Sequence, residues 1–69
     1  MINKNKLLSK IVEAGMTQRT LAAAMGISEN TFSSKINGKG YFDTEQVVKI
    51  CDILGIVDSD IKAEIFLNN

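Results

Sequence analysis

The side chains of this chain that are best suited to chemistry are uncharged hydrogen-bonding groups between residues 28 and 39. On a helical wheel of about 100° per residue, four of them share one face, at about 100° to 200° from Phe32: Ser33, Asn37, Asn30 and Ser34. Ile36 and Glu29 fall beside Phe32 at the buried edge, with Thr31 and Lys35 on the flanks. Asn and Ser are indifferent helix formers, and a helix that faces only solvent more often carries Glu and Lys. The pattern therefore predicts a helix face that hydrogen-bonds to a partner.

This face belongs to the second of two short helices that the sequence predicts in succession. Thr17 is a suitable cap for the first helix, which carries Leu21 and Met25 four residues apart on one face. Gly26 accepts the left-handed backbone conformation that ends a helix tightly, and Ser28 can cap the next one. The turn between the helices is therefore about three residues long.

The residues in and around these two helices resemble the marker residues of the Cro/repressor-type (XRE-like) helix-turn-helix family of phage and prophage regulators. The markers are Gln18, Ala22, Gly26-Ile27-Ser28, Phe32 and Asn37-Gly38. The resemblance covers about Leu7 to Phe66, and the segment Ser33–Lys39 is similar to a phage-repressor subgroup. Lys35 departs from the pattern, because the broader family usually has an apolar residue there, and Ile36 is expected to take over its packing.

The resemblance implies a fold and a function. The fold is all-α, a compact bundle of five short helices like the lambda-repressor DNA-binding domain, with a helix-turn-helix formed by the second and third helices. Residues 1–69 would form this single domain. The function is that of a sequence-specific double-stranded DNA-binding transcriptional regulator, a phage-type repressor whose third helix, about residues 28–37, lies in the major groove.

Five residues of the predicted third helix are candidates for reading bases: Glu29, Asn30, Thr31, Ser33 and Ser34. Asn30 could bind an adenine through two hydrogen bonds. Ser34, with Thr31 or Ser33, could bond to either donors or acceptors. Glu29 could accept a hydrogen bond from a cytosine amino group, but it could equally repel phosphate or merely complement the helix dipole, so its role stays open.

Five further residues are candidates for contacting DNA phosphates: Gln18, Arg19, Lys35, Asn37 and Lys39. Gln18 begins the first helix of the motif, where free N–H groups and the helix dipole favour an anion. Asn37 and Lys39 stand at the far end of the second helix, where the resemblance also implies a backbone contact. Because one such helix reads only a few base pairs, we expect two copies on a palindromic operator, and the homodimer could form on DNA only.

The charge of the chain divides along the sequence. The formal net charge is +0, but residues 1–41 hold six basic and two acidic groups, and residues 42–69 hold two basic and six acidic groups. These counts correspond to +4 and −4, so we expect a dipole whose positive end contains the helix-turn-helix. An alternative keeps the fold but makes the partner a protein, as for an antirepressor or antidote, and the zero net charge and Glu29 favour it.

The segments that flank the motif give further expectations. Residues 1–5 are expected to be flexible, although Lys4 and Lys6 could reach a phosphate as a loose arm, and the first helix is expected over Lys6–Ala14. After the motif, Gly38 should supply a positive φ and Phe42 should anchor the chain to the core. Tyr41 or Phe42 should be buried and the other semi-exposed, within reach of a phosphate.

The sequence of the last third of the chain predicts two more helices. One is capped by Asp43, and the other by Asp58 or Ser59. The apolar end Ile65-Phe66-Leu67 either covers the core or pairs with a second copy, and the first interpretation is preferred because a domain this small needs the buried area.

Several kinds of chemistry are not expected from this composition. The chain has no histidine, and Cys51 is its only cysteine, so neither an internal disulfide nor a zinc site is expected and Cys51 is interpreted as a packing residue. No catalytic motif, cofactor loop or small-molecule site is evident, so we expect no enzyme. With no signal peptide and no apolar run near 18 residues, a reducing cytoplasm, bacterial or of a phage-infected host, is expected.

Overall fold

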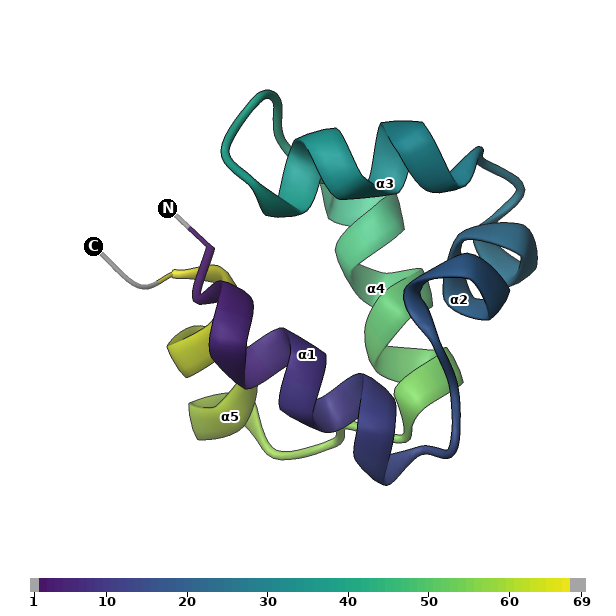
Figure 1. The fold of residues 1–69 in the computed structure, drawn as a ribbon. Coiled ribbons are helices and arrows are strands. Elements are labelled where there is room, and N and C mark those ends of the chain that lie inside the picture. Colours follow the sequence, from purple (N-terminus) through teal and green to yellow (C-terminus); the bar gives the residue numbers. More distant parts are fainter. Residues whose placement is uncertain (1, 68–69) are drawn as a thin grey trace.

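Five short helices make up the computed structural model of the chain, which describes residues 2–67. They are α1 (Lys4–Glu13), α2 (Gln18–Met25), α3 (Glu29–Ile36), α4 (Thr44–Leu54) and α5 (Ser59–Phe66). No strand occurs within the described residues. Figure 1 shows α3 lying across one end of the molecule, with α4 running from it toward the opposite end and α1 beside α5. The predicted all-α bundle of five short helices is confirmed.

Each helix begins after a residue whose side chain accepts a hydrogen bond from the backbone of the first turn. These capping residues are Asn3, Thr17, Ser28, Asp43 and Asp58. Thr17 and Asp43 form full capping boxes, in which the residue three positions later bonds back to the cap. At the other ends, Gly26 and Gly55 take left-handed conformations with φ of +78° and +71°. The predicted caps Thr17, Ser28 and Asp43 are confirmed, and Asp58 rather than Ser59 caps α5.

The start of α1 differs from the expectation. The helix begins at Lys4 rather than Lys6 and ends at Glu13, one residue early. Asn3 makes the earlier start possible, because its side chain accepts a hydrogen bond from the backbone of Lys6 and its own N–H donates to the carbonyl oxygen of Ile65 at 2.7 Å. Of the segment expected to be flexible, residues 3–5 thus belong to α1 and its cap, while Met1 lies outside the described residues.

The core is apolar and draws on all five helices. Its fully or almost fully buried members are Leu7, Ile11, Leu21, Ala22, Met25, Phe32, Ile36, Ile50, Cys51, Ile56 and Ile65. Phe32 has no exposed surface and stands 5.4 Å, centre to centre, from the ring of the half-buried Phe42. No polar or charged side chain is buried among the described residues. Phe42 therefore anchors the chain after α3, as predicted.

The apolar end of the chain covers the core through one residue. Ile65 is completely buried against α1, whereas Leu67 is 73% exposed. This supports the preferred interpretation of α5 as a cover for the core, and a contact with a second copy stays a prediction. None of the described helices combines the length and hydropathy needed to span a bilayer.

Candidate nucleic-acid interface

The geometry of α3 is set by the short connection that precedes it. Gly26 ends α2, the N–H of Ile27 donates back to the carbonyl oxygen of Ala22 at 3.0 Å, and Ser28 already caps α3. Phe32 and Ile36, 0% and 2% exposed, attach α3 to the core along one edge. The opposite side of α3 consequently faces outward at the end of the molecule (Figure 1).

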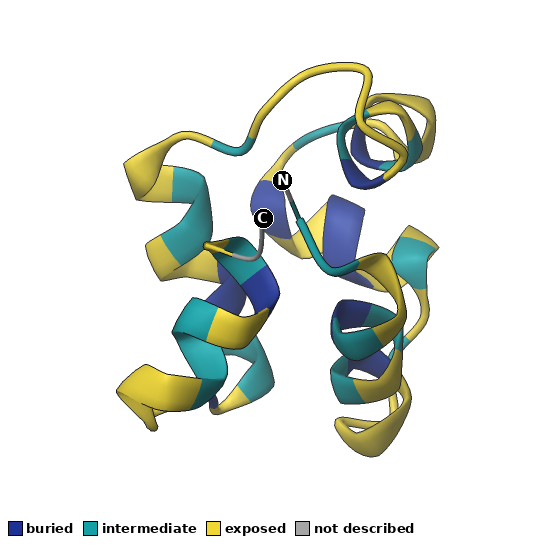
Figure 2. Ribbon diagram, turned by 90° about the vertical axis from the view of Figure 1, so that its left-hand side faces the viewer, coloured by how far each residue is buried: buried dark blue, intermediate teal, exposed yellow. Residues whose placement is uncertain are grey.

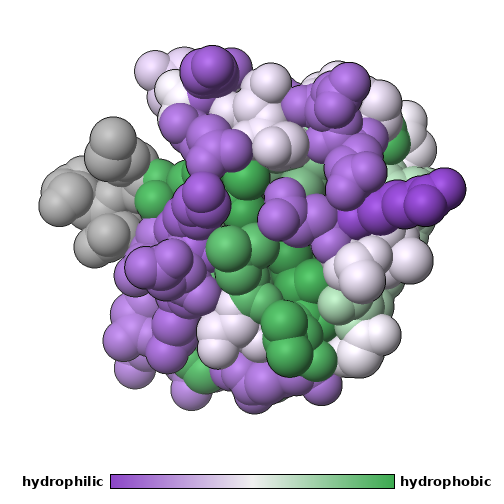
Figure 3. All heavy atoms as spheres, in the orientation of Figure 1, coloured by the Kyte–Doolittle hydropathy of each residue, from purple (hydrophilic) through white to green (hydrophobic). Residues whose placement is uncertain are grey.

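The outward side of α3 carries two polar side chains that the protein leaves free. Asn30 and Ser34 are both exposed and are four residues apart, so they lie on the same face of the helix. Within residues 2–67 neither side chain forms a hydrogen bond to another part of the protein. In Figure 3 the upper edge of the molecule, where Figure 1 places α3, is mostly purple and white, and the hydrophobic surface lies lower on the face. The two side chains are thus available to an external partner.

The other candidate base-reading residues differ in availability. The hydroxyl of Thr31 accepts a hydrogen bond from the capping hydroxyl of Ser28 at 2.9 Å. Ser33 is half-buried, and its hydroxyl lies 3.3 Å from the side-chain nitrogen of Asn37. Glu29 is exposed, so its placement at the buried edge of the wheel was wrong. Glu29 is the first residue of α3, directly after the cap Ser28, and its carboxylate lies on the outer surface.

The start of α2 offers the hydrogen-bond donors expected there. Thr17 and Thr20 bond to each other's backbone, at 3.1 Å and 2.9 Å, which uses one orphan N–H of the helix. The N–H groups of Gln18 and Arg19 find no acceptor within the part of the chain that the structure describes. Arg19 is exposed and Gln18 is half-buried. This helix start can therefore receive an anion through two backbone donors and the positive end of the helix dipole.

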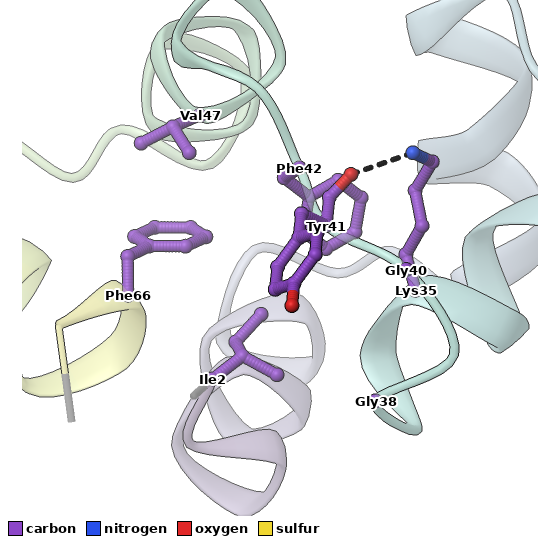
Figure 4. A pocket seen from close by; sticks show the side chains of 8 residues that line it. All are labelled: Ile2, Lys35, Gly38, Gly40, Tyr41, Phe42, Val47 and Phe66. Atoms are coloured by element: carbon purple, nitrogen blue, oxygen red, sulfur yellow. Dashed lines mark hydrogen bonds between the residues drawn. The ribbon is translucent and has the colours of Figure 1, made fainter. Parts of the chain in front are cut away.

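Lys35, a weaker candidate for a phosphate contact, has partners within the protein. Its ammonium donates to the carbonyl oxygen of Tyr41 at 2.6 Å and lies 6.0 Å from the centre of the Phe42 ring. Its stem passes beside Gly40 (Figure 4). Ile36 takes the buried position next to it, as predicted. Lys35 thus supports the segment that follows α3.

That segment, residues 37–41, runs exposed over the molecule (Figure 2). Gly38 has the predicted positive φ of +85°, and Lys39 is exposed. Tyr41 is 88% exposed and Phe42 is half-buried, so the expectation that one of them is buried and the other semi-exposed is wrong. The exposed ammonium of Lys39 and phenol of Tyr41 follow directly on the free face of α3.

Asn37, at the end of α3, is tied to two other parts of the protein. Its side-chain nitrogen donates to the carbonyl oxygen of Ser33 at 2.8 Å, and its side-chain oxygen accepts from the ammonium of Lys4 at 2.7 Å. Sequence reasoning considered Lys4 only as part of a loose arm that could reach a phosphate, and did not place it among the ten candidate residues. Nothing in the local sequence signals a contact between residues 33 positions apart, and it follows only from the early start of α1.

One of the two ion pairs among the described residues joins the oppositely charged halves of the sequence. Lys6 of α1 pairs with Glu64 of α5 at 3.4 Å, and Lys10 pairs with Glu13 at 3.5 Å. The other basic groups of residues 1–41 form no ion pair within the described residues: Lys4, Arg19, Lys35 and Lys39. They stand at the starts of α1 and α2 and at the end of α3 and beyond. In the other half of the sequence, Lys49 of α4 and Lys62 of α5 also form no ion pair within the described residues, so unpaired positive charge is present on both halves.

A depression with a volume of about 350 Å³ lies beside the segment after α3 (Figure 4). Ile2, Phe42, Val47 and Phe66 form its apolar wall, and Tyr41 stands at its edge. No carboxylate, thiol or imidazole is among the described residues that line it. The depression therefore offers apolar contact and shows no constellation for acid–base or nucleophilic chemistry.

Cys51 is enclosed by the core and 2% exposed. Burial raises the pKa of its thiol above the ordinary value of 9.0, with Lys62 lowering it and Asp52 raising it as smaller effects. The neutral thiol packs as a small apolar side chain. No group of three or more potential metal-ligating side chains occurs among the described residues.

Fold and surface together define a small all-α domain whose end helix α3 exposes Asn30 and Ser34, which have no side-chain partner among residues 2–67, beside the carboxylate of Glu29. A family model described as "Protein of unknown function (DUF739)" matches residues 2–69, so the chain belongs to that family. A comparison with curated proteins finds no match.

Proposed function

We propose that this protein is a sequence-specific double-stranded DNA-binding transcriptional regulator, a repressor of the phage type. In this proposal α2 and α3 form a lambda-repressor-like helix-turn-helix, and α3 lies in the major groove. The observation that carries the proposal is the free outer face of α3. Asn30 and Ser34 are exposed and have no hydrogen-bond partner among the described residues, while Phe32 and Ile36 hold the same helix firmly to the core.

The available groups suit direct contact with base edges. An asparagine can bind the N6 and N7 positions of adenine through two hydrogen bonds, and a serine hydroxyl can bond to donors or acceptors. Asn30 and Ser34 are the principal candidates, with the hydroxyl of Thr31 beside them. Ser33 is a lesser candidate because it is half-buried and contacts Asn37. The exposed carboxylate of Glu29 would accept from a cytosine amino group or keep phosphates away.

Contacts with phosphates would hold α3 in register at both ends of the motif. At the start of α2, the backbone N–H groups of Gln18 and Arg19 would donate to a phosphate, and the exposed guanidinium of Arg19 lies beside them. The exposed ammonium of Lys39, which follows α3, would contact a phosphate at the other end of the proposed helix-turn-helix. Such contacts release counterions, so affinity should fall steeply as the salt concentration rises.

A useful operator requires more base pairs than one helix reads. We therefore propose two copies of the chain on a palindromic site, with half-sites about one helical turn apart. Such a pair could assemble only when both copies are on DNA.

A protein partner is the second candidate function. Glu29 favours it, because this exposed carboxylate at the start of α3 would meet the negatively charged backbone of DNA. The net charge of +0 also favours a protein partner over DNA. In that case the outer face of α3 would bind another regulator, as in an antirepressor or antidote.

Selection of binding sites from a random pool of duplex DNA, followed by mobility-shift titrations at two salt concentrations, tests the proposal. We expect enrichment of a palindromic sequence that the protein binds more tightly than unrelated DNA, and weaker binding at the higher salt concentration. If no duplex shifts at the lower salt concentration while circular dichroism shows a folded protein, the DNA proposal is wrong and the protein partner is favoured.

A further inference from the structure

The contact between Lys4 and Asn37 joins the first turn of α1 to the end of α3. The ammonium of Lys4 donates to the side-chain oxygen of Asn37 at 2.7 Å, and both side chains are exposed. This bond brings a lysine from the start of the chain to the end of the helix that we propose to enter the major groove. No other hydrogen bond between the described residues of α1 and α3 exists.

The hydrogen-bonding capacity of the two side chains distinguishes their roles. An asparagine side chain has two N–H donors on one nitrogen. This nitrogen of Asn37 lies 2.8 Å from the carbonyl oxygen of Ser33 and 3.3 Å from its hydroxyl. The side-chain oxygen of Asn37 is occupied by Lys4. A lysine ammonium has three donors, and within residues 2–67 Lys4 uses one of them. Asn37 therefore has little left to offer a phosphate, whereas Lys4 has two donors and a full positive charge.

The neighbouring basic residues of α1 do not share this availability. Lys6 is paired with Glu64 of α5, and Lys10 is paired with Glu13 and borders the connection between α4 and α5. That connection lies at the end of the molecule opposite α3 (Figure 1). Lys4 is thus the basic residue of α1 that faces the proposed DNA surface without a carboxylate partner among the described residues.

We propose that Lys4 binds a phosphodiester group of the DNA backbone and that Asn37 acts as a positioning residue, which holds the Lys4 ammonium at the end of α3. This inference rests on the proposed function. It changes the expected role of Asn37 from a direct phosphate contact to a support for one. It also turns the supposed loose N-terminal arm into an ordered part of the interface, because Lys4 lies in α1.

The test compares Lys4→Met with Lys10→Met in the full chain. Both variants remove one positive charge from α1, and methionine retains most of the apolar stem. With a duplex selected from a random pool and an unrelated duplex as probes, we expect Lys4→Met to weaken binding to both alike. The slope of log affinity against log salt concentration should fall by about 0.9, the value for one phosphate contact. Lys10→Met should leave the slope unchanged.

Asn37→Ala tests the positioning role. We expect it to weaken binding in the wild-type background and to have a much smaller effect in the Lys4→Met background, because the two residues act through one contact. A merely structural role of Asn37 would give the same loss in both backgrounds. In the absence of DNA, Lys4→Met should shift the NMR signals of the Asn37 side-chain amide, and Lys10→Met should not.

The outcomes separate this inference from the proposed function. If the wild-type protein binds the selected duplex but Lys4→Met retains both its affinity and its salt slope, the inference is wrong and the proposed function stands. If the folded wild-type protein binds no duplex, both are wrong. Thermal unfolding monitored by circular dichroism establishes that each variant is folded in these comparisons.

Discussion

Polar residues of the same type have different roles in this protein according to their partners. Asn30 and Asn37 both lie on or at the end of α3, and both are exposed. Asn37 bonds to Ser33 and Lys4, whereas Asn30 has no partner among the described residues. The amide of Asn37 therefore stabilises the end of the helix, and that of Asn30 is exposed without a partner in the described part of the chain. The helical wheel places both on the same face and does not distinguish them.

Replacement of Asn30 by alanine tests base reading by a single side chain. We expect Asn30→Ala to fold normally, because the side chain makes no hydrogen bond to any other residue of the described range 2–67 and alanine favours helix formation. Its affinity for the selected operator should fall by about 1–3 kcal/mol, with the preference lost at one base position. Repeating the selection from random DNA with the variant measures this effect. An unchanged preferred sequence would show that Asn30 does not read a base.

Variants of two lysines near the end of α3 distinguish a lysine that contacts a phosphate from one that supports the segment after α3. Lys39 is exposed, whereas the ammonium of Lys35 is bonded to the carbonyl oxygen of Tyr41. We expect Lys39→Ala to weaken binding to all sequences alike and to lower the salt slope by about one. Lys35→Met should change the slope much less but accelerate amide hydrogen exchange in residues 38–41, since their support is lost. Equal slope changes in the two variants would restore Lys35 as a direct phosphate contact.

For the helices, the local sequence was sufficient to predict most of the residues at which they begin and end. Caps such as Thr17 and Asp43, and the glycine that ends α2, act within a few residues of the chain, so their effects could be predicted. The start of α1 was missed although it has a local signal, because Asn3 caps the helix by accepting a hydrogen bond from the N–H of Lys6. The second bond of Asn3, to Ile65, could not be read from the local sequence. The internal partners of Lys35 likewise required the three-dimensional path of the chain after α3.

In the candidate site, too, some features could be predicted from the local sequence and others could not. The free face of α3 was predicted from the spacing of Asn30 and Ser34 relative to Phe32 and Ile36, and the structure places both polar residues on the exposed side. Glu29 was misplaced because a wheel assumes that every turn of the helix lies equally close to the core.

The turn between α2 and α3 depends on the positive φ of Gly26, and a matched pair of variants tests it. A Cβ atom added at Gly26 or at Gly55 would meet nothing within 4 Å, so the cost of alanine comes from the left-handed backbone alone. We expect Gly26→Ala and Gly55→Ala each to lower the free energy of unfolding by about 1–2 kcal/mol. Urea unfolding measures this loss. An unchanged stability of Gly26→Ala would mean that the turn accommodates another backbone conformation.

For the whole molecule, stability comes mainly from a single apolar core that all five helices share. Lys6 and Glu64 join α1 to α5, but such an exposed pair contributes little stability. Burial of residues such as Phe32 and Ile65 is the larger contribution. Because the core is continuous, we expect the domain to unfold in one cooperative step.

The pKa and the reactivity of the Cys51 thiol can be used to follow this cooperative unfolding. Burial raises the pKa of its thiol, so the folded state favours the neutral form more than the unfolded state does. This contribution to stability is fully present below the ordinary pKa of 9.0 and is lost as the pH rises through the higher pKa of the folded state. At pH 8 a thiol reagent should react with native Cys51 only as fast as the protein unfolds.

The matching control is Cys51→Ala. Above pH 9 the wild-type protein should lose more stability than this variant does, with the difference taken from denaturant unfolding at each pH. Immediate reaction of the thiol under native conditions would contradict the buried placement of Cys51.

The central claim, that the outer face of α3 contacts DNA, is tested most directly by NMR. Isotopically labelled protein is titrated with the duplex selected from random DNA, and the backbone and side-chain amide signals are followed. We predict the largest changes at residues 29–34, at the start of α2 and at Lys39, with the side-chain amide of Asn30 among the most affected. Changes confined to α4 and α5, or no changes at all, would contradict the claim.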